Sequence, residues 1–341
     1  MHALFERHAL QHKSVLGGKF CRMRFPKGAC TKEKIIMSKI IVIGSSNTDM
    51  VIKSKHLPAP GETILGGSFL MNPGGKGANQ AVAAAKLGGD VVFVARVGDD
   101  LFGREAVDGF KKVGVDTDYI VVDPQNPSGI ATIMVDDNGE NCISVASGAN
   151  NALSSVDVDK AVEQIKEAST ILMQLETPLA TIEYAASLGR RLGKSVILNP
   201  APACELREEL LACIDIITPN ESEAELLTGI SVTCADSAGK AAEELRAKGV
   251  GTVIITMGVS GAFVLSNDFI GVVPSRKVEA VDTTAAGDTF NGALAVALAQ
   301  GMPIEDAVRF SNIAASISVT RMGAQSSTPL FSEVEKIAGD L

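Results

Sequence analysis

Histidine is scarce in this sequence, which has four in 341 residues, three of them before residue 13. Catalysis by a serine, histidine and aspartate triad has almost no side chains to use, so we exclude a hydrolase of that kind. The cysteines include no C-x-x-C pair and have no nearby histidine to complete a metal site. We interpret them as reduced, mostly structural thiols; they are Cys21, Cys30, Cys142, Cys204, Cys213 and Cys234.

Long apolar runs are also missing. No stretch approaches the roughly 18 residues of a membrane span, and the N-terminus lacks the apolar core of a secretion signal. We therefore expect a cytoplasmic protein with no membrane partner. The net charge is −9, but residues 1–36 carry eight Lys or Arg against two Glu, which leaves −15 on the rest. Such an acidic body disfavours nucleic acid as a partner.

Two glycine fingerprints of nucleotide binding are absent. No G-x-G-x-x-G follows the first clear strand, Ile40 to Ile43, which argues against a nicotinamide dehydrogenase. The turn from Gly74 to Gly77 is no Walker loop, because no Ser or Thr follows Lys76. A hydrophobic content of 46% nevertheless supports one large core, or one core with a small appendage.

The chain divides into an extension and a folded domain. Residues 1–36 are basic and without clear periodicity, and their single serine argues against a transit peptide. We interpret them as a disordered or artefactual extension, with Met37 as a candidate start. The folded domain is expected over residues 37–341.

Strands and helices alternate through this domain, which predicts an α/β fold with a mostly parallel sheet and helices on both faces. Strands are expected at 91–95, 170–175, 195–198, 214–218 and 252–256, and helices near 78–87, 101–113, 157–167, 178–192, 221–228 and 236–248. Two irregular, strand-like regions, about 50–73 and 128–148, break the alternation. The second contains the hairpin signal Asp137-Asn138-Gly139, so we expect both to form a small β-sheet.

The stretch from Asp282 to Gly292 has the pattern of an active-site turn. Three small residues precede Asp288, and an apolar helical run follows, so Asp288 is placed at a helix N-terminus. Asp is also a preferred N-cap, which is the simpler interpretation. A cap, however, needs neither the preceding Ala-Ala-Gly nor a second carboxylate, Asp282, at the end of an expected strand. A base beside an anion-binding turn needs both.

Two segments carry a family resemblance. Asp282 to Phe290, DTTAAGDTF, resembles the C-terminal signature of the ribokinase-like (PfkB) family of carbohydrate kinases, and Gly74 to Ala81, GGKGANQA, resembles its N-terminal signature. The resemblance covers Ile40 to the C-terminus and departs at Ala285, where many relatives have glycine. It implies ATP-dependent phosphorylation of a sugar beneath a β-sheet lid that excludes water.

The resemblance implies D-ribose as the acceptor, phosphorylated at its primary hydroxyl. Asp288 would be the base and also touch the sugar, and a carboxylate with an ordinary pKa of about 3.9 would suffice. The other implied sugar contacts are Asn47, Asp49, Gly75, Lys76, Asn79 and Glu176. From the residues alone, Asn47 and Asp49 fit an Asx turn equally well, and the glycines fit close helix packing. Another sugar, a nucleoside or a non-catalytic sugar-binding relative remain alternatives.

The family pattern also implies an ATP site and two cations. ATP contacts would be Asn220, Thr256, Gly258, Gly261, Ala286, Gly287 and Asn312. Glu223 would order Mg²⁺ through water, although Asn220 and Glu223 alone favour a helix capping box. K⁺ would bind Asp282, Thr284, Ser318, Arg321, Gly323 and Ser327, mostly through carbonyls. A homodimer through the exposed lid edges is implied as well.

Overall fold

The computed structural model describes residues 38–339, so the predicted extension at 1–36 lies outside the described residues. A nine-stranded sheet forms the centre, in the order β13-β12-β11-β10-β9-β8-β1-β4-β5. Pairing is parallel from β11 to β5 and antiparallel for β12 and β13, which confirms the mostly parallel sheet. The strands are β1 (Ile40–Ile43), β4 (Val91–Gly98), β5 (Ile120–Asp123), β8 (Thr170–Met173), β9 (Ser195–Leu198), β10 (Ile216–Ile217), β11 (Thr252–Thr256), β12 (Ala262–Leu265) and β13 (Ile270–Val273).

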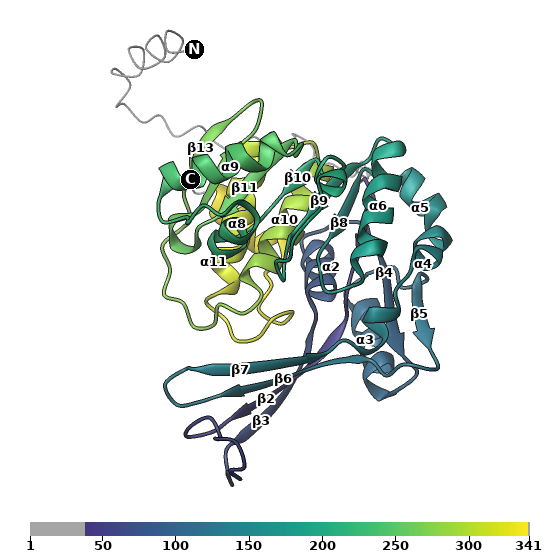
Figure 1. Ribbon diagram of the computed structural model, residues 1–341, viewed down its shortest axis with the longest axis vertical. Coiled ribbons are helices and arrows are strands. Elements are labelled where there is room, and N and C mark those ends of the chain that lie inside the picture. The colour runs from purple at the N-terminus through teal and green to yellow at the C-terminus, as the bar shows by residue number, and fades with distance from the viewer. Residues whose placement is uncertain (1–37, 340–341) are drawn as a thin grey trace.

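Helices cover both faces of this sheet (Figure 1). In β1, Ile40 and Val42 enter one apolar core while Ile41 and Ile43 enter the other, which explains why this strand is apolar throughout. The first core is closed by α2 (Lys76–Lys86), α3 (Leu101–Lys112), α10 (Ala286–Ala299), α11 (Ile304–Ser318) and α12 (Phe331–Gly339). The second is closed by α4 (Ser155–Lys160), α5 (Val162–Glu167), α6 (Leu179–Arg191), α7 (Glu208–Leu211), α8 (Glu221–Thr228) and α9 (Ala235–Ala247).

The strand order reverses beside β1. From β1 the chain continues to β4 and β5 on one side, and it then returns to β8, β9, β10 and β11 on the other. In open α/β sheets, ligands bind outside the carboxyl ends of the strands at such a reversal. The carboxyl ends of β1 and β8 therefore mark where a site is expected.

A second sheet of four strands projects from the main body as a curved ribbon (Figure 1). Its order is β3-β2-β6-β7, with strands β2 (Asn47–Lys53), β3 (Ser68–Gly74), β6 (Gly129–Val135) and β7 (Asn141–Ala146). The two irregular regions thus combine as expected, and the hairpin turn falls between β6 and β7. Because β2 begins at Asn47, both Asn47 and Asp49 belong to this sheet and not to an Asx turn.

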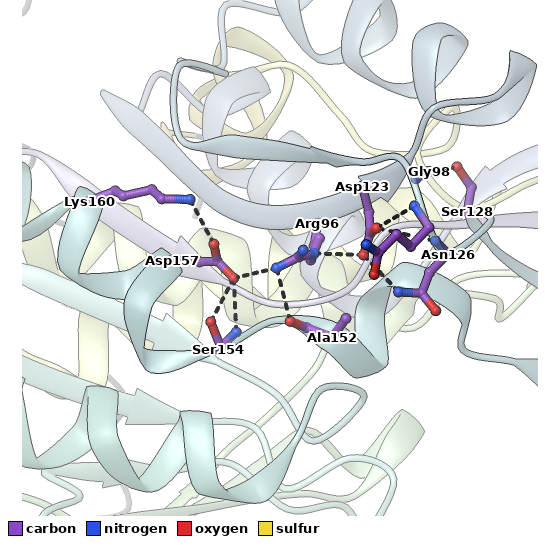
Figure 2. Close-up of polar contacts among 10 residues, drawn as sticks. Arg96, Gly98, Asp123, Asn126, Ser128, Ala152, Ser154, Asp157 and Lys160 are labelled. Carbon is purple, nitrogen blue, oxygen red and sulfur yellow. Dashed lines mark hydrogen bonds and ion pairs between the residues drawn. The ribbon is translucent and has the colours of Figure 1, made fainter.

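A buried ion network connects β4, β5 and α4 (Figure 2). Arg96 of β4 donates from Nε to Asp123 Oδ2 at 2.9 Å and from Nη1 to Asp157 Oδ2 at 3.0 Å. The two carboxylate side chains are only 2% and 3% exposed. Hydrogen bonds from Asn126 and Gln125, with Arg96, lower the pKa of Asp123 to about 2. The network joins β4, β5 and α4 just before the chain enters β6.

Three sequence expectations differ from the structure. The helix expected at 157–167 is two helices, α4 and α5, that meet at Ala161, and α4 starts early because Ser154 and Asp157 form a capping box. Asp282 ends no strand; its N–H donates to the Val319 carbonyl at 3.1 Å in a loop. The short elements β5, α7 and α12 were not predicted. Among residues 38–339, no helix is long and apolar enough to cross a bilayer.

Candidate active site

Asp288 lies in the first turn of α10 and is 7% exposed. The N-cap is Ala285, so the interpretation of Asp288 as a cap is wrong. Ala285 has φ of 57°, the one positive φ of a non-glycine residue in the described chain. The Ala286 N–H donates to the Thr283 carbonyl at 3.2 Å, whereas helix geometry leaves Gly287 and Asp288 without an i−4 partner. The positive end of the helix dipole is therefore available beside the carboxylate.

Two side-chain amides hold the Asp288 carboxylate. Asn79 Nδ2 donates to Oδ2 and Gln80 Nε2 donates to Oδ1, both at 2.9 Å. Burial raises the pKa of Asp288 above its usual range, against the charge of Lys76 and the two amide bonds, which lower it. An ordinary pKa would suffice for phosphoryl transfer, but burial favours a higher one here. A raised pKa makes Asp288 a better proton acceptor, provided that it is ionised at the working pH.

Glu176 contacts the segment that follows β1, the strand beside which the strand order reverses. It follows β8, and its Oε2 accepts from Ser45 Oγ, just after β1, at 2.6 Å and from the Lys76 N–H at 2.9 Å. One carboxylate thus ties the ends of both central strands to the start of α2. This is the position that the strand order predicts for a ligand site.

The glycine turn brings backbone segments into close contact. Gly75 has φ of 88°, and a Cβ there would lie 2.7 Å from the Asn47 backbone nitrogen. A Cβ on Gly77 would lie 2.5 Å from the Ser45 nitrogen. Close packing, the simpler interpretation of these glycines, therefore holds, and it also brings Lys76 and Asn79 to the carboxylates.

Asp49 faces the same group of charges from β2. Burial raises its pKa to about 6, with the negative charges of Glu176 and Asp288 adding to the shift and Lys76 opposing it. Asn79 Oδ1 is buried nearby without a hydrogen-bond partner among the described residues. An acceptor in this position suits a ligand that brings a hydroxyl donor.

Asn47 is oriented by a residue that the sequence did not reveal. Asn150, 1% exposed, donates from Nδ2 to Asn47 Oδ1 at 2.7 Å and accepts the Ser46 N–H at 2.8 Å. Because Asn47 Oδ1 accepts this bond, its Nδ2 remains as the donor of the side chain.

The expected ATP residues divide into two kinds. Asn220 and Glu223 form the capping box of α8, with reciprocal bonds of 2.8 and 2.9 Å, so the simpler interpretation is confirmed. Burial raises the pKa of Glu223, and the charges of Lys76 and Asp288 both act on it, which places it near the carboxylate group. Glu223 is therefore the residue of α8 whose charge interacts with Lys76 and Asp288.

Ala286 and Gly287 begin α10 beside Asp288, and the other expected ATP residues lie on or near the hairpin that follows β11. Thr256 donates its N–H to the Pro219 carbonyl at 2.9 Å, and Gly258 opens a short 3-10 helix with φ of 51°. A Cβ on Gly261 would lie 2.1 Å from the Val273 carbonyl, so glycine is required there by the hairpin itself. Asn312 donates to the same carbonyl at 2.9 Å and thereby holds the end of β13.

Asp282 is hydrogen-bonded to both of the loops that are expected to hold K⁺. Its two carboxylate oxygens accept from the Thr284 N–H at 2.9 Å and the Gly323 N–H at 2.8 Å. The Ser318 carbonyl accepts from the Arg321 N–H at 3.0 Å, while Ser327 Oγ donates to the Ala324 carbonyl at 2.8 Å. The expected ligands therefore lie in two connected turns rich in carbonyl groups.

The donor set fits cations that need few protein carboxylates. Within residues 38–339, no three His, Cys, Asp or Glu side chains gather to hold a metal ion. Mg²⁺ keeps most of its waters and is usually held by one or two carboxylates with substrate phosphates, which Glu223 alone can assist. Carbonyl-rich turns suit a monovalent cation of the potassium type.

Several buried polar side chains near Asp288 were given no role from the sequence, because their partners are distant in sequence. Gln80, Gln174, Asn199, Thr218 and Asn291 form a buried polar chain behind Asp288. A signal was present, since Gln174 and Asn199 each interrupt or end an apolar strand. The sequence does not say, however, which groups they bind.

Fold and site together define an α/β enzyme with a buried carboxylate beside a helix N-terminus, at the strand-order reversal of a parallel sheet. The chain belongs to the pfkB family of carbohydrate kinases, whose family model matches residues 37–330. The family resemblance of the two signatures is thereby confirmed.

Similar proteins cover nearly the whole folded domain. A ribokinase of Haemophilus influenzae is 47% identical over 294 residues, 86% of this chain and 96% of that protein. A deoxyribokinase of Salmonella typhi is 41% identical over 291 residues, 85% of this chain and 95% of that protein. The structure of Arabidopsis thaliana ribokinase complexed with ribose and ATP has a TM-score of 0.83 and 33% identity, covering 89% of this chain and 99% of that chain.

Proposed function

We propose that this protein transfers the γ-phosphoryl group of ATP to the primary hydroxyl of D-ribose, giving ribose 5-phosphate and ADP. The observation that carries this proposal is the buried Asp288 carboxylate, held by two amides at the start of α10. The ribokinase of Haemophilus influenzae, at 47% identity, supports the choice of sugar.

Asp288 accepts the proton of the attacking hydroxyl as the new O–P bond forms and the bond to ADP breaks. The amides of Ala286 and Gly287 stabilise negative charge on the transferred group, with the Ala286 N–H leaving the Thr283 carbonyl to do so. The sugar hydroxyls bind Asn47, Asp49, Gly75, Lys76, Asn79 and Glu176. The unpaired Asn79 Oδ1 supports such a contact.

ATP lies along the turns after β10 and β11. Asn220, Thr256, Gly258 and Gly261 line its phosphates and ribose, and Asn312 shapes the adenine side by holding β13. Mg²⁺, with Glu223 contacting it through water, supplies charge neutralisation for the phosphates.

A monovalent cation of the potassium type occupies the paired turns of Asp282 and Gly323. The ligands of this cation are Asp282, Thr284, Ser318, Arg321, Gly323 and Ser327. Asp282 accepts from the Thr284 N–H, two residues before Ala286, so a cation held there would lie beside the anion turn and would help to keep it ordered.

The four-stranded sheet acts as a lid over the sugar and as the contact surface of a homodimer. Its edge strand β7 is exposed along its whole length, and Ile143 and Val145 are 59% and 51% exposed. Exposed edges and apolar side chains of this kind favour pairing with a second copy. The free cysteines Cys142, Cys204, Cys213 and Cys234 fit a reducing cytoplasm.

The test is ADP release with MgATP and a panel of acceptors: ribose, 2-deoxyribose, fructose, adenosine and none, each with and without K⁺. We expect turnover selective for ribose and raised by K⁺. 2-Deoxyribose is the second candidate, because of the Salmonella deoxyribokinase at 41% identity. Binding of ribose without turnover by any acceptor would instead identify a non-catalytic sugar-binding protein.

A further inference from the structure

The side-chain amide of Gln80 is fully buried, and both its N–H groups and its carbonyl oxygen have hydrogen-bond partners. Its Nε2 donates to Asp288 Oδ1 at 2.9 Å and to Asn199 Oδ1 at 3.0 Å. Its Oε1 accepts from Gln174 Nε2 at 2.6 Å. Because Gln174 donates to Oε1, the amide group has one orientation only, with both N–H groups directed at acceptors.

A second set of bonds returns from Asn199 to the backbone beside Asp288. Asn199 Nδ2 donates to the Thr218 carbonyl at 3.1 Å, and Thr218 Oγ1 donates to Asn291 Oδ1 at 2.6 Å. Asn291 Nδ2 then donates to the Gly287 carbonyl at 2.8 Å. That carbonyl belongs to the peptide whose N–H is the Asp288 amide, so the chain of bonds closes on Asp288. We name Gln80, Gln174, Asn199, Thr218 and Asn291 the amide circuit.

The amide circuit is anchored on rigid elements. Its members follow β8, β9 and β10 or lie on α2 and α10, and each is at most 7% exposed. Gln174 Oε1 is buried without a hydrogen-bond partner among the described residues. Rotation of the Gln80 amide would nevertheless remove the donors to Asp288 and Asn199 and turn Oε1 toward their oxygens, so the bonds of Gln80 favour one arrangement. Phosphoryl transfer depends on such fixed placement of base and charge-stabilising groups.

We propose that Gln80 is a positioning residue, which fixes the Asp288 carboxylate relative to the anion turn through the amide circuit. This rests on the proposed function, in which Asp288 is the base. Through the amide circuit, the positions of Asp288 and of the anion turn are both fixed relative to the carboxyl ends of the central strands.

The proposal has an electrostatic consequence. A donor to a carboxylate stabilises the charged form, so losing the Gln80 bond raises the proton affinity of Asp288 further. The charged groups that act on Asp288 are Lys76 from α2, Glu176 after β8, Asp49 from β2 and Glu223 from α8. All of them remain in a Gln80 variant, so a change in titration is attributable to the lost amide.

The experiment compares kcat as a function of pH, over roughly pH 5 to 9, for wild type, Gln80→Leu and Gln80→Glu. We expect Gln80→Leu to lower kcat by about tenfold or more and to move its acid limb to higher pH, with KM for MgATP little changed. Gln80→Glu donates to Asp288 only while protonated, so it should show a new loss of activity as pH rises. This second variant keeps the Gln174 partner and the side-chain volume.

Asn126→Leu is the matched control, because Asn126 Nδ2 donates to Asp123 Oδ2 at the same 2.9 Å, far from Asp288 in sequence (Figure 2). It should lower stability and leave the acid limb of kcat in place. A wild-type pH profile in folded Gln80→Leu and Gln80→Glu, or an equal shift in Asn126→Leu, would overturn the proposal.

A carboxyl ¹³C titration separates this proposal from the proposed function. The Asp288 signal, assigned by its loss in Asp288→Asn, should titrate at higher pH in Gln80→Leu than in wild type, whether or not any sugar is phosphorylated. An unchanged titration contradicts the role of Gln80. Lack of turnover in the wild type contradicts only the proposed function.

Discussion

Asp49 lies where burial and two carboxylates oppose its negative charge, so its pKa in the folded protein is about 6 against 3.8 for the free side chain. Between these values the folded state binds more protons than the unfolded state. The free energy of unfolding therefore falls as pH rises through this window, and the loss is complete above about pH 6. Above this window the ligand-free protein holds the Asp49 carboxylate in its charged, partly desolvated form. A sugar hydroxyl would donate a hydrogen bond to that carboxylate.

Asp49→Asn should consequently stabilise the ligand-free protein while impairing sugar binding. At pH above that window we expect a gain of about 1–3 kcal/mol in unfolding free energy, since the buried charge is gone. KM for ribose should rise by about tenfold or more, because the charged acceptor is lost. Denaturant unfolding and sugar kinetics check both; equal stabilisation at low and high pH would contradict the electrostatic cause.

In the wild type, KM for ribose should rise as pH falls through about 6, because protonation converts Asp49 from an acceptor to a donor. Asp49→Asn removes this dependence and serves as the control. A flat KM in the wild type over this range would show that the sugar contact does not need the charge.

Single residues could be named as candidate site residues where the neighbouring sequence marked their position. Asp288 was placed by the helix pattern that follows it, and Asn47 and Asp49 by their position after β1. Gln80 was not recognised, because its bond to Asp288 spans 208 positions and a glutamine has no local preference that reveals a partner. The raised pKa of Asp288 was not predicted for the same reason, since burial is a property of the fold.

At the scale of elements, the Arg96 network ties β4 and β5 of the central sheet to α4 (Figure 2). Replacing Arg96 with Met leaves Asp123 and Asp157 buried without their shared cation. Removing one partner of a buried ion pair typically costs about 3–5 kcal/mol, and we expect a loss of that order in the free energy of unfolding.

Arg104→Met is the matched control, because Arg104 and Asp99 form an ion pair with side chains 64% and 62% exposed. It should change stability by about 1 kcal/mol or less, owing to solvent screening. Urea unfolding of both variants measures the difference; similar losses would mean that the buried network has no special role in stability.

Elements with strong local patterns were predicted well, including α8, β9 and β11. The start of β2 was missed because Asn47 and Asp49 are weak strand formers, and the pairing with β3 and β6 overrides that preference. The single helix expected at 157–167 failed at Ala161, where nothing in the composition marks a break.

For the whole molecule, the proposed homodimer makes a separate prediction. Ile143→Asp places a charge on the exposed edge strand β7 and should shift the protein toward monomer in sedimentation equilibrium. Ile270→Asp is the control, since Ile270 is 67% exposed on β13, the edge strand of the central sheet. Dimer loss in Ile270→Asp alone would move the interface to that edge.

The alternation of strands and helices was enough to predict the fold class, and the two irregular regions were enough to predict the small sheet. Strand order was beyond reach, because it depends on pairing between segments such as β1 and β8 that lie far apart in sequence. The sequence could therefore name candidate site residues, but it could not show that they meet at the reversal of strand order.

Phosphoryl transfer from MgATP to ribose by wild type and Asp288→Asn, followed by ³¹P NMR of the product, tests the proposed chemistry most directly. We predict ribose 5-phosphate from the wild type and a loss of about 10³-fold or more in kcat for a folded Asp288→Asn, with ribose binding retained. Near-normal kcat in Asp288→Asn, or phosphate on another hydroxyl, would contradict the role of Asp288 as the base for the primary hydroxyl.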